Sequence, residues 1–193
     1  GQDCTAACRI YAQAGIHDRL VAALGDAVSS IRFARKKDAD NEIGPLISTR
    51  QRDRVSSFVE RALSQPYVEC VSGASVHDGP GFYYPPTILD CTDAPDAPCV
   101  RQECFGPILS VIAFDTEDEA LTLANDTIYG LAGFVFTANV GRGLALAERI
   151  NAGSVWVNDI HRSNHSAPFG GMKQSGVGRE KGRYGVESYL EYK

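Results

Sequence analysis

The sequence contains no apolar run that approaches the ~20 residues a membrane-spanning helix needs, and it has no excess of positive charge. Lys and Arg number 19 against 24 Asp and Glu, so the formal net charge is −5. A nucleic-acid-binding surface therefore has little electrostatic support. The densest cationic stretch, Arg35–Lys37, is followed at once by acidic residues, and we interpret it as a solvated loop. We expect neither a membrane nor a nucleic acid among the partners.

Phosphate-binding fingerprints, internal repeats and low-complexity tracts are also missing. Neither G-x-G-x-x-G after a strand nor G-x-x-x-x-G-K-[ST] occurs, so no familiar phosphate loop is predicted. Hydrophobic residues make up 44% and charged residues 22% of the 193 positions. These values are typical of a globular domain with a real core. The chain opens on Gly1 and directly on a motif, so we expect part of a longer protein or a processed chain.

Six cysteines offer three alternative uses. Disulfides are one, but this is not a short secreted scaffold. Buried or reactive thiols in a reducing compartment are another, and they favour a cytoplasmic protein. A four-thiolate zinc site is the third, although the spacing from Cys99 to Cys104 is wide for a zinc knuckle, and we expect no metal. The six residues are Cys4, Cys8, Cys70, Cys91, Cys99 and Cys104.

Hydrophobic periodicity predicts alternating strands and helices. Pro85-Pro86 argues against a central strand over residues 82–89. From residue 108 onward strands alternate with helices, which favours an α/β fold with a largely parallel sheet and flanking helices. The predicted strands are 9–12, 68–72, 108–114, 131–137 and 154–158, and the predicted helices are 17–32, one capped by Ser48, 117–125 and 142–150. Residues 189–193 are predicted to form a further strand, which needs a partner strand such as one from another subunit.

The opening segment Gly1-Gln2-Asp3-Cys4-Thr5 is the first candidate for chemistry. A cysteine between a glycine turn and small residues is compatible with a helix N-terminus, where free N–H groups favour a thiolate and stabilise an oxyanion. The alternative is that Cys4 is only a buried small residue, because free cysteine is among the most buried types. The residue types alone leave both open.

Two further segments attract attention. Gln102–Pro107 places the carboxylate of Glu103 beside the aromatic ring of Phe105 before a buried strand, which suits a sugar hydroxyl and a flat ring, although an ordinary turn would look the same. The glycine-rich stretch Pro168–Glu180 predicts a loop with unusual backbone angles.

Taken together and in order, five segments resemble the aldehyde dehydrogenase superfamily over nearly the whole chain. The string around Cys4 most resembles bacterial aminoaldehyde (4-aminobutanal) dehydrogenases. The segments are G-Q-D-C at 1–4, Q-E-C-F-G-P at 102–107, N-x-x-x-Y-G-L at 125–131, G-S-V-W-V-N at 153–158 and P-F-G-G-M-K-Q-S-G-V-G-R-E at 168–180.

The resemblance implies a role for each matching residue. Cys4 falls on the nucleophile and its N–H on half of the oxyanion hole. Glu103 falls on the residue that binds the nicotinamide ribose, and Phe105 packs beside the nicotinamide of NAD or NADP. The substrate-pocket positions are Asp3, Thr5, Ser163 and Phe169, and Ser163 replaces an aromatic, so a wider or more polar pocket is implied. Residues 1–187 would form the catalytic domain and 188–193 the start of an oligomerisation strand in a homo-dimer or homo-tetramer.

The implied reaction is the NAD(P)-dependent oxidation of a small aldehyde through a thiohemiacetal and a thioester on Cys4. In the family the general base, the second oxyanion donor and the cofactor domain lie upstream of the cysteine, so this chain is expected to be inactive alone. Two alternatives remain: a relative that releases the thioester to coenzyme A, and a catalytically silent module of the same fold. The acidic Asp3 suits an ammonium-bearing aldehyde, but it serves equally well as a helix cap.

Overall fold

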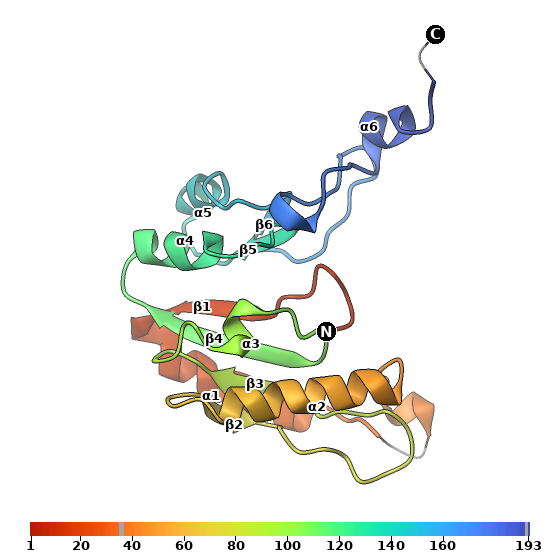
Figure 1. Cartoon of the computed structure of the whole chain (residues 1–193). Helices are drawn as coiled ribbons and strands as arrows, with labels where there is room; N and C mark the ends of the chain where they lie inside the picture. The colour runs from red at the N-terminus through yellow and green to blue at the C-terminus, as the bar shows by residue number, and fades with distance from the viewer. Residues whose placement is uncertain (35–36, 192) are drawn as a thin grey trace. The chain divides into compact units, whose positions relative to one another are not determined.

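The computed structural model describes residues 1–34, 37–191 and 193, which form two compact units, Gly1–Thr116 and Glu117–Lys193 (Figure 1). Arg35 and Lys36 of the cationic stretch lie outside the described residues, and Lys37 is exposed. No helix in the described part of the chain is long and apolar enough to cross a membrane.

The first unit is built on a four-stranded sheet whose order is β1-β4-β3-β2. The strands β1 and β3 both pair with β4 in parallel, whereas β2 pairs with β3 antiparallel. The N-terminal ends of β1, β4 and β3 therefore lie at one edge, and the segments that precede these strands meet there. The strands are β1 (Arg9–Gln13), β2 (Glu69–Ser72), β3 (Thr87–Asp90) and β4 (Ile108–Phe114).

Both faces of this sheet are covered. Neighbouring strand residues point to opposite faces, and Ile88 and Leu89 are both completely buried. Helix α1 (Ala14–Ser30) packs Leu20, Leu24 and other apolar residues against the Ile88 side. In Figure 1, α2 (Thr49–Leu63) crosses the front of this unit. The unit also contains the short helices η1 (Asp38–Asp40) and α3 (Pro98–Arg101).

The expectation that Pro85 and Pro86 keep their segment out of the sheet interior was wrong. Strand β3 lies between β4 and β2, and it begins at Thr87, immediately after the second proline. Proline lacks the N–H that a ladder needs only at its own position. The two prolines therefore determine where β3 begins, and Thr87 makes the first ladder bond by donating its N–H to the carbonyl of Pro107 at 2.8 Å.

The second unit follows the predicted alternation to within a few residues. Its two strands form a separate parallel pair, so the expected sheet is divided into two. Three of the four strand pairs in the described chain are parallel, which confirms an α/β fold with a mainly parallel sheet. The elements are α4 (Glu117–Asn125), β5 (Ala132–Val135), α5 (Val140–Ala147), β6 (Ser154–Val157), η2 (Lys173–Ser175) and α6 (Gly182–Glu187).

The chain after α6 adopts no strand in the described residues. Tyr189 is 91% exposed and Leu190 is 55% exposed, while Tyr192 lies outside the described residues. The strand expected over 189–193 required a partner chain, so it stays a prediction.

Candidate active site

The segment around Cys4 is a tight turn, so the predicted helix N-terminus was wrong. One carboxylate oxygen of Asp3, Oδ1, accepts hydrogen bonds from the backbone N–H and the hydroxyl of Thr5, each at 2.7 Å. The backbone N–H of Ala6 donates to the carbonyl of Asp3 at 3.1 Å. An Asp side chain that closes a turn in this way competes with helix formation. Asp3 thus closes a turn at Cys4 and caps no helix there, so the helix-cap alternative for this residue was wrong.

Cys4 is exposed on this turn, together with its neighbours Gly1–Asp3. Exposure contradicts the alternative in which Cys4 is a buried filler residue. Because no helix begins here, the helix-dipole argument for thiolate formation does not apply to Cys4. The turn leaves the thiol of Cys4 exposed to solvent in this chain.

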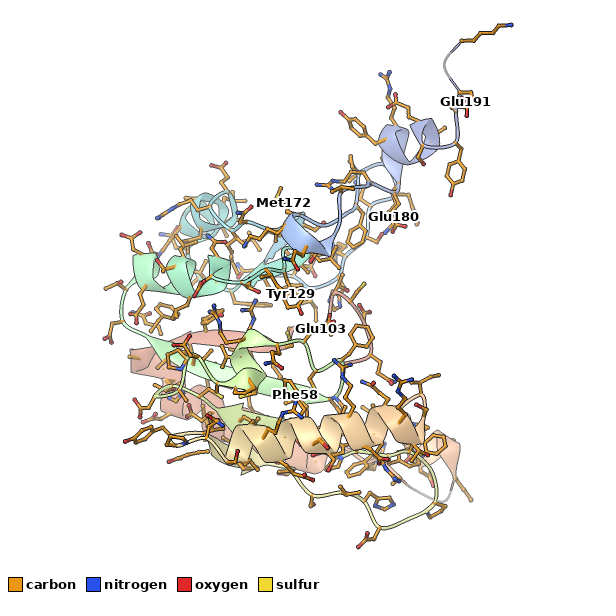
Figure 2. All side chains as sticks on the ribbon, viewed as in Figure 1. Phe58, Glu103, Tyr129, Met172, Glu180 and Glu191 are labelled. Atoms are coloured by element: carbon orange, nitrogen blue, oxygen red, sulfur yellow. The ribbon has the colours of Figure 1, made fainter. Side chains whose placement is uncertain are left out.

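The loop Gln102–Pro107 is held by α2. The side-chain amide of Gln51 donates from Nε2 to the Phe105 carbonyl at 2.8 Å and to the Cys104 carbonyl at 3.4 Å. The guanidinium of Arg54 donates to the Glu103 carbonyl at 3.0 Å. The backbone of this loop is therefore held by α2, while Glu103, labelled in Figure 2, is an exposed residue.

Two further features show how closely this loop is packed. Phe105 has a φ of 57°, a backbone conformation uncommon for a residue with a side chain. A Cβ atom on Gly106 would lie 2.5 Å from a methyl carbon of Val55 on α2, so only glycine fits there. Burial raises the pKa of the neighbouring Cys104 thiol to about 12, which makes Cys104 a poor nucleophile.

The fold brings the Cys4 turn and the Glu103 loop together. The turn precedes β1 and the loop precedes β4, and these strands are parallel neighbours. The backbone N–H of Ser110 donates to the Cys8 carbonyl at 3.0 Å. A Cβ on Gly1 would collide with the backbone of Gly106, which shows direct contact between the two segments. The two motifs that are about a hundred residues apart therefore meet at one sheet edge.

In the second unit, the two residues predicted to line a substrate pocket are linked by a lysine. The ammonium of Lys181 donates to the hydroxyl of Ser163 at 3.0 Å and lies 4.9 Å from the centroid of the Phe169 ring. Phe169 and Glu180 exchange two backbone hydrogen bonds of 2.8 Å. No local pattern singled out Lys181, because its contacts join Ser163 and Phe169, which lie far from it along the chain.

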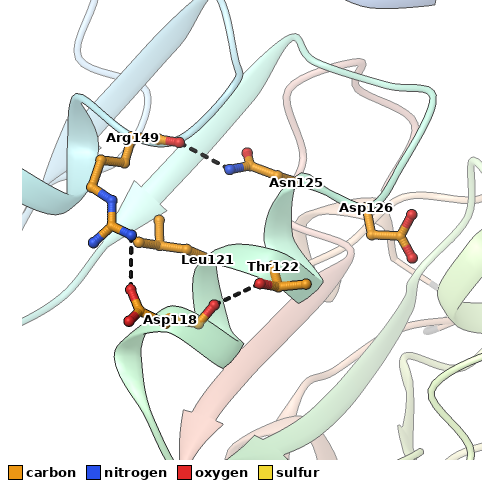
Figure 3. Close-up of a pocket in the computed structure, with 6 residues that line it drawn as sticks. All are labelled: Asp118, Leu121, Thr122, Asn125, Asp126 and Arg149. Carbon is orange, nitrogen blue, oxygen red and sulfur yellow. Dashed lines mark hydrogen bonds and ion pairs between the residues drawn. The ribbon is translucent and has the colours of Figure 1, made fainter.

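The first residue of the N-x-x-x-Y-G-L segment, Asn125, makes hydrogen bonds within the second unit. Asn125 donates from Nδ2 to the Arg149 carbonyl at 2.9 Å and accepts from the N–H of Asn151 at 2.7 Å. Arg149 also forms an ion pair with Asp118 at 2.8 Å (Figure 3). These contacts join the end of α4 to the segment after α5. The shallow pocket that they line holds none of the predicted catalytic or substrate residues.

No metal centre is assembled in the described part of the chain. Among residues 1–34, 37–191 and 193, no group of three or more His, Cys, Asp or Glu side chains is placed to hold an ion. Cys4 and Cys8 are exposed, whereas Cys99 and Cys104 are buried. The four thiols of the zinc alternative are thus not gathered.

Comparisons with known proteins agree with the motifs. The sequence model of the aldehyde dehydrogenase family matches residues 1–193. A (Z)-2-((N-methylformamido)methylene)-5-hydroxybutyrolactone dehydrogenase from Acinetobacter baylyi is 42% identical over the whole chain, and a betaine aldehyde dehydrogenase from Bacillus subtilis is 40% identical. The chain covers 38% and 40% of these two relatives.

A solved structure shows the same architecture. Betaine aldehyde dehydrogenase from Staphylococcus aureus in complex with NAD+ superimposes with a TM-score of 0.92 at 40% identity. The match covers 98% of this chain and 38% of that protein. The fold found here is therefore that of one part of a much longer polypeptide in the relative.

Proposed function

This chain belongs to the aldehyde dehydrogenase family, and we propose that it supplies the catalytic cysteine of an NAD(P)-dependent enzyme that oxidises an aldehyde to a carboxylic acid. The observation that carries the proposal is the meeting of two motifs at one sheet edge. The exposed thiol of Cys4 lies on a turn whose first residue contacts the loop that presents Glu103 and Phe105.

The proposed chemistry begins with the sulfur of Cys4. Its thiolate attacks the aldehyde carbonyl carbon and forms a thiohemiacetal. The backbone N–H of Cys4 would stabilise the negative oxygen that develops in this step. Loss of hydride from the carbon leaves a thioester on Cys4, and water then releases the acid with the help of a general base.

NAD or NADP, when bound, accepts the hydride, and two residues of this chain suit its nicotinamide end. The exposed carboxylate of Glu103 accepts hydrogen bonds, so it matches the hydroxyls of a ribose. The ring of Phe105 provides an apolar surface for the nicotinamide. The clamp from Gln51 and Arg54 keeps the loop backbone in place, so both side chains are presented from a rigid support.

Other parts of the machinery are assigned outside this chain. The chain covers about 40% of the length of its relatives. We assign the general base, the second oxyanion donor and the dinucleotide-binding domain to the portion of a longer protein that precedes Gly1. None of the glutamates in this chain is given the role of base, and the chain alone is proposed to lack turnover.

The substrate contacts are proposed to include Asp3, Thr5, Ser163 and Phe169. The family resemblance around Cys4 favours an amino- or ammonium-bearing aldehyde, and one relative bears the name betaine aldehyde dehydrogenase. However, Asp3 already accepts two hydrogen bonds from Thr5, and Ser163 accepts one from the cationic Lys181. These contacts occupy the groups that an ammonium would need, so we propose an aldehyde without a defined charge as the substrate.

Assembly into a homo-dimer or homo-tetramer is also proposed. Tyr189 and Leu190, which follow α6, are 91% and 55% exposed. A strand over residues 189–193 that pairs with another subunit would cover this apolar surface.

The test compares two exposed cysteines that lie four positions apart. In the full-length protein that contains this chain, Cys4→Ala should abolish aldehyde-dependent reduction of NAD or NADP and leave the circular dichroism spectrum unchanged. Cys8→Ala is the matched control because Cys8 is also exposed, and it should retain most of the activity. Loss of activity only in the Cys8 variant would identify Cys8 as the nucleophile and overturn the assignment to Cys4.

A further inference from the structure

Two buried cysteines that play no part in the proposed reaction lie side by side in the first unit. Cys91 directly follows β3, and Cys99 is the second residue of α3. Their sulfur atoms are 3.3 Å apart, close enough for the S–H of one to hydrogen-bond the other. Cys91 is completely buried and Cys99 is 6% exposed. Both are free thiols.

Hydrogen bonds to strand β4 hold both cysteines in place, so the short distance does not depend on a loose loop. The N–H of Cys91 donates to the Val111 carbonyl on β4 at 2.8 Å. The hydroxyl of Ser110, also on β4, donates to the Cys99 carbonyl at 2.9 Å. Two successive turns, closed by Ala94 and Ala97, connect the two cysteines. Both ends of the pair are thereby attached to the same central strand.

The two thiols differ in acidity. The hydrogen bond shared with Cys91 lowers the pKa of Cys99, and contacts with Ser110 and nearby backbone N–H groups lower it further against the opposing effect of burial. The same shared hydrogen bond, together with burial, raises the pKa of Cys91. A thiol that ionises readily beside one that stays protonated is the arrangement found in pairs of attacking and resolving cysteines.

We propose that Cys91 and Cys99 are an oxidisable dithiol that a hydroperoxide converts to an internal disulfide and a dithiol reductant reopens. The Cys99 thiolate attacks one peroxide oxygen, the O–O bond breaks, and hydroxide leaves and is protonated to water. The sulfur of Cys91 then attacks the resulting Cys99 sulfenic acid, losing its own proton, and displaces a second hydroxide, which also becomes water. Two thiols and one peroxide give one disulfide and two waters.

The geometry demands only a small movement. A disulfide bond is about 2.05 Å long, so the two sulfurs must approach by little more than 1 Å. Helix α3, which carries Cys99, has four residues and follows two turns. Cys104 provides the contrast, because it is buried too, yet no hydrogen bond to another sulfur is found for it among the described residues.

The experiment uses the folded chain and hydrogen peroxide. Cys4, Cys8 and Cys70 are exposed, so iodoacetamide blocks them first under native conditions. Peroxide follows, and the denatured chain is then treated with a second alkylating reagent of different mass. Trypsin alone would leave Cys91 and Cys99 in one peptide, because residues 62–100 contain no Lys or Arg. A protease that cleaves before aspartate separates them at Asp93 and Asp96.

We expect the two peptides to be joined by a disulfide in most of the folded molecules, and to separate after dithiothreitol. Cys104 should carry the second reagent. Cys91→Ser and Cys99→Ser should each abolish the linkage, and Cys104→Ser should preserve it. The proposal is overturned if both thiols remain free after peroxide, if either pairs with Cys104 instead, or if the linkage forms only when denaturant is present during oxidation.

Discussion

At the scale of single residues, the candidate site depends on side chains that work through the backbone. Asp3 closes the turn that exposes Cys4, and Gln51 and Arg54 hold the carbonyls of the Glu103 loop. Local residue types marked Cys4, Glu103 and Phe105 as candidates, and only the resemblance to aldehyde dehydrogenases gave them their expected roles. The residues that hold this site in place could not be identified from the sequence. The contact between Gln51 and Phe105, for example, spans 54 positions and therefore leaves no local sequence pattern.

Glu103 is the residue whose assigned role is most directly testable. In the full-length protein, Glu103→Gln keeps the size and exposure of the side chain but removes the charge that strengthens a hydrogen bond to a hydroxyl. A misplaced nicotinamide should slow hydride transfer by up to about 10²-fold, with a smaller effect on the KM for aldehyde.

Single-turnover kinetics with a deuterated aldehyde measure this step. Glu60→Gln is a suitable control, because Glu60 is an exposed glutamate on α2 whose carboxylate accepts from the Ser56 hydroxyl. An unchanged hydride-transfer rate in Glu103→Gln would contradict the assigned role.

At the scale of elements, the sequence predicted most of the fold. Strand β4 matches the predicted range 108–114. A short apolar run that follows Gly-Pro favours a buried strand. Two predictions failed for local reasons: Asp3 closes a turn where a helix start was expected, and Pro85-Pro86 precedes a central strand instead of excluding one. Local propensity located the elements, but their neighbours in the sheet were determined by tertiary packing.

Helix α2 permits a prediction about stability. Ser48 caps this helix, and its hydroxyl oxygen accepts the N–H of Gln51 at 3.2 Å. Ser48→Ala should lower the free energy of unfolding by about 1 kcal/mol, measured by urea denaturation of the chain. Ser57→Ala on the exposed face of the same helix is the control, and it should be neutral or slightly stabilising because alanine favours helix. Equal effects of the two substitutions would show that the cap does not stabilise α2.

At the scale of the whole molecule, the chain has the family fold, and we propose that it carries only part of the catalytic groups. It carries the proposed nucleophile and the residues for the nicotinamide end of the cofactor. The relatives that match it are more than twice as long. A cofactor held at one end loses most of its binding energy, because each contact made elsewhere contributes to the total.

We therefore expect the purified 193-residue chain to show no sustained NAD(P)-dependent aldehyde oxidation. Thioester hydrolysis would lack its proposed base, so any chemistry should stop after one equivalent, as in slow acylation of Cys4 by an activated ester. The exposed apolar residues, among them Val177 at 97% and Tyr189 at 91% exposure, should also favour association of the chain.

The absorbance of reduced nicotinamide measures turnover, and intact-mass spectrometry counts the acyl groups on the chain. The Cys4→Ala variant separates acylation of Cys4 from acylation of other thiols. Continuous production of reduced nicotinamide would mean that this chain holds a complete active site, and the assignment of the base and cofactor domain to a preceding portion would then be wrong.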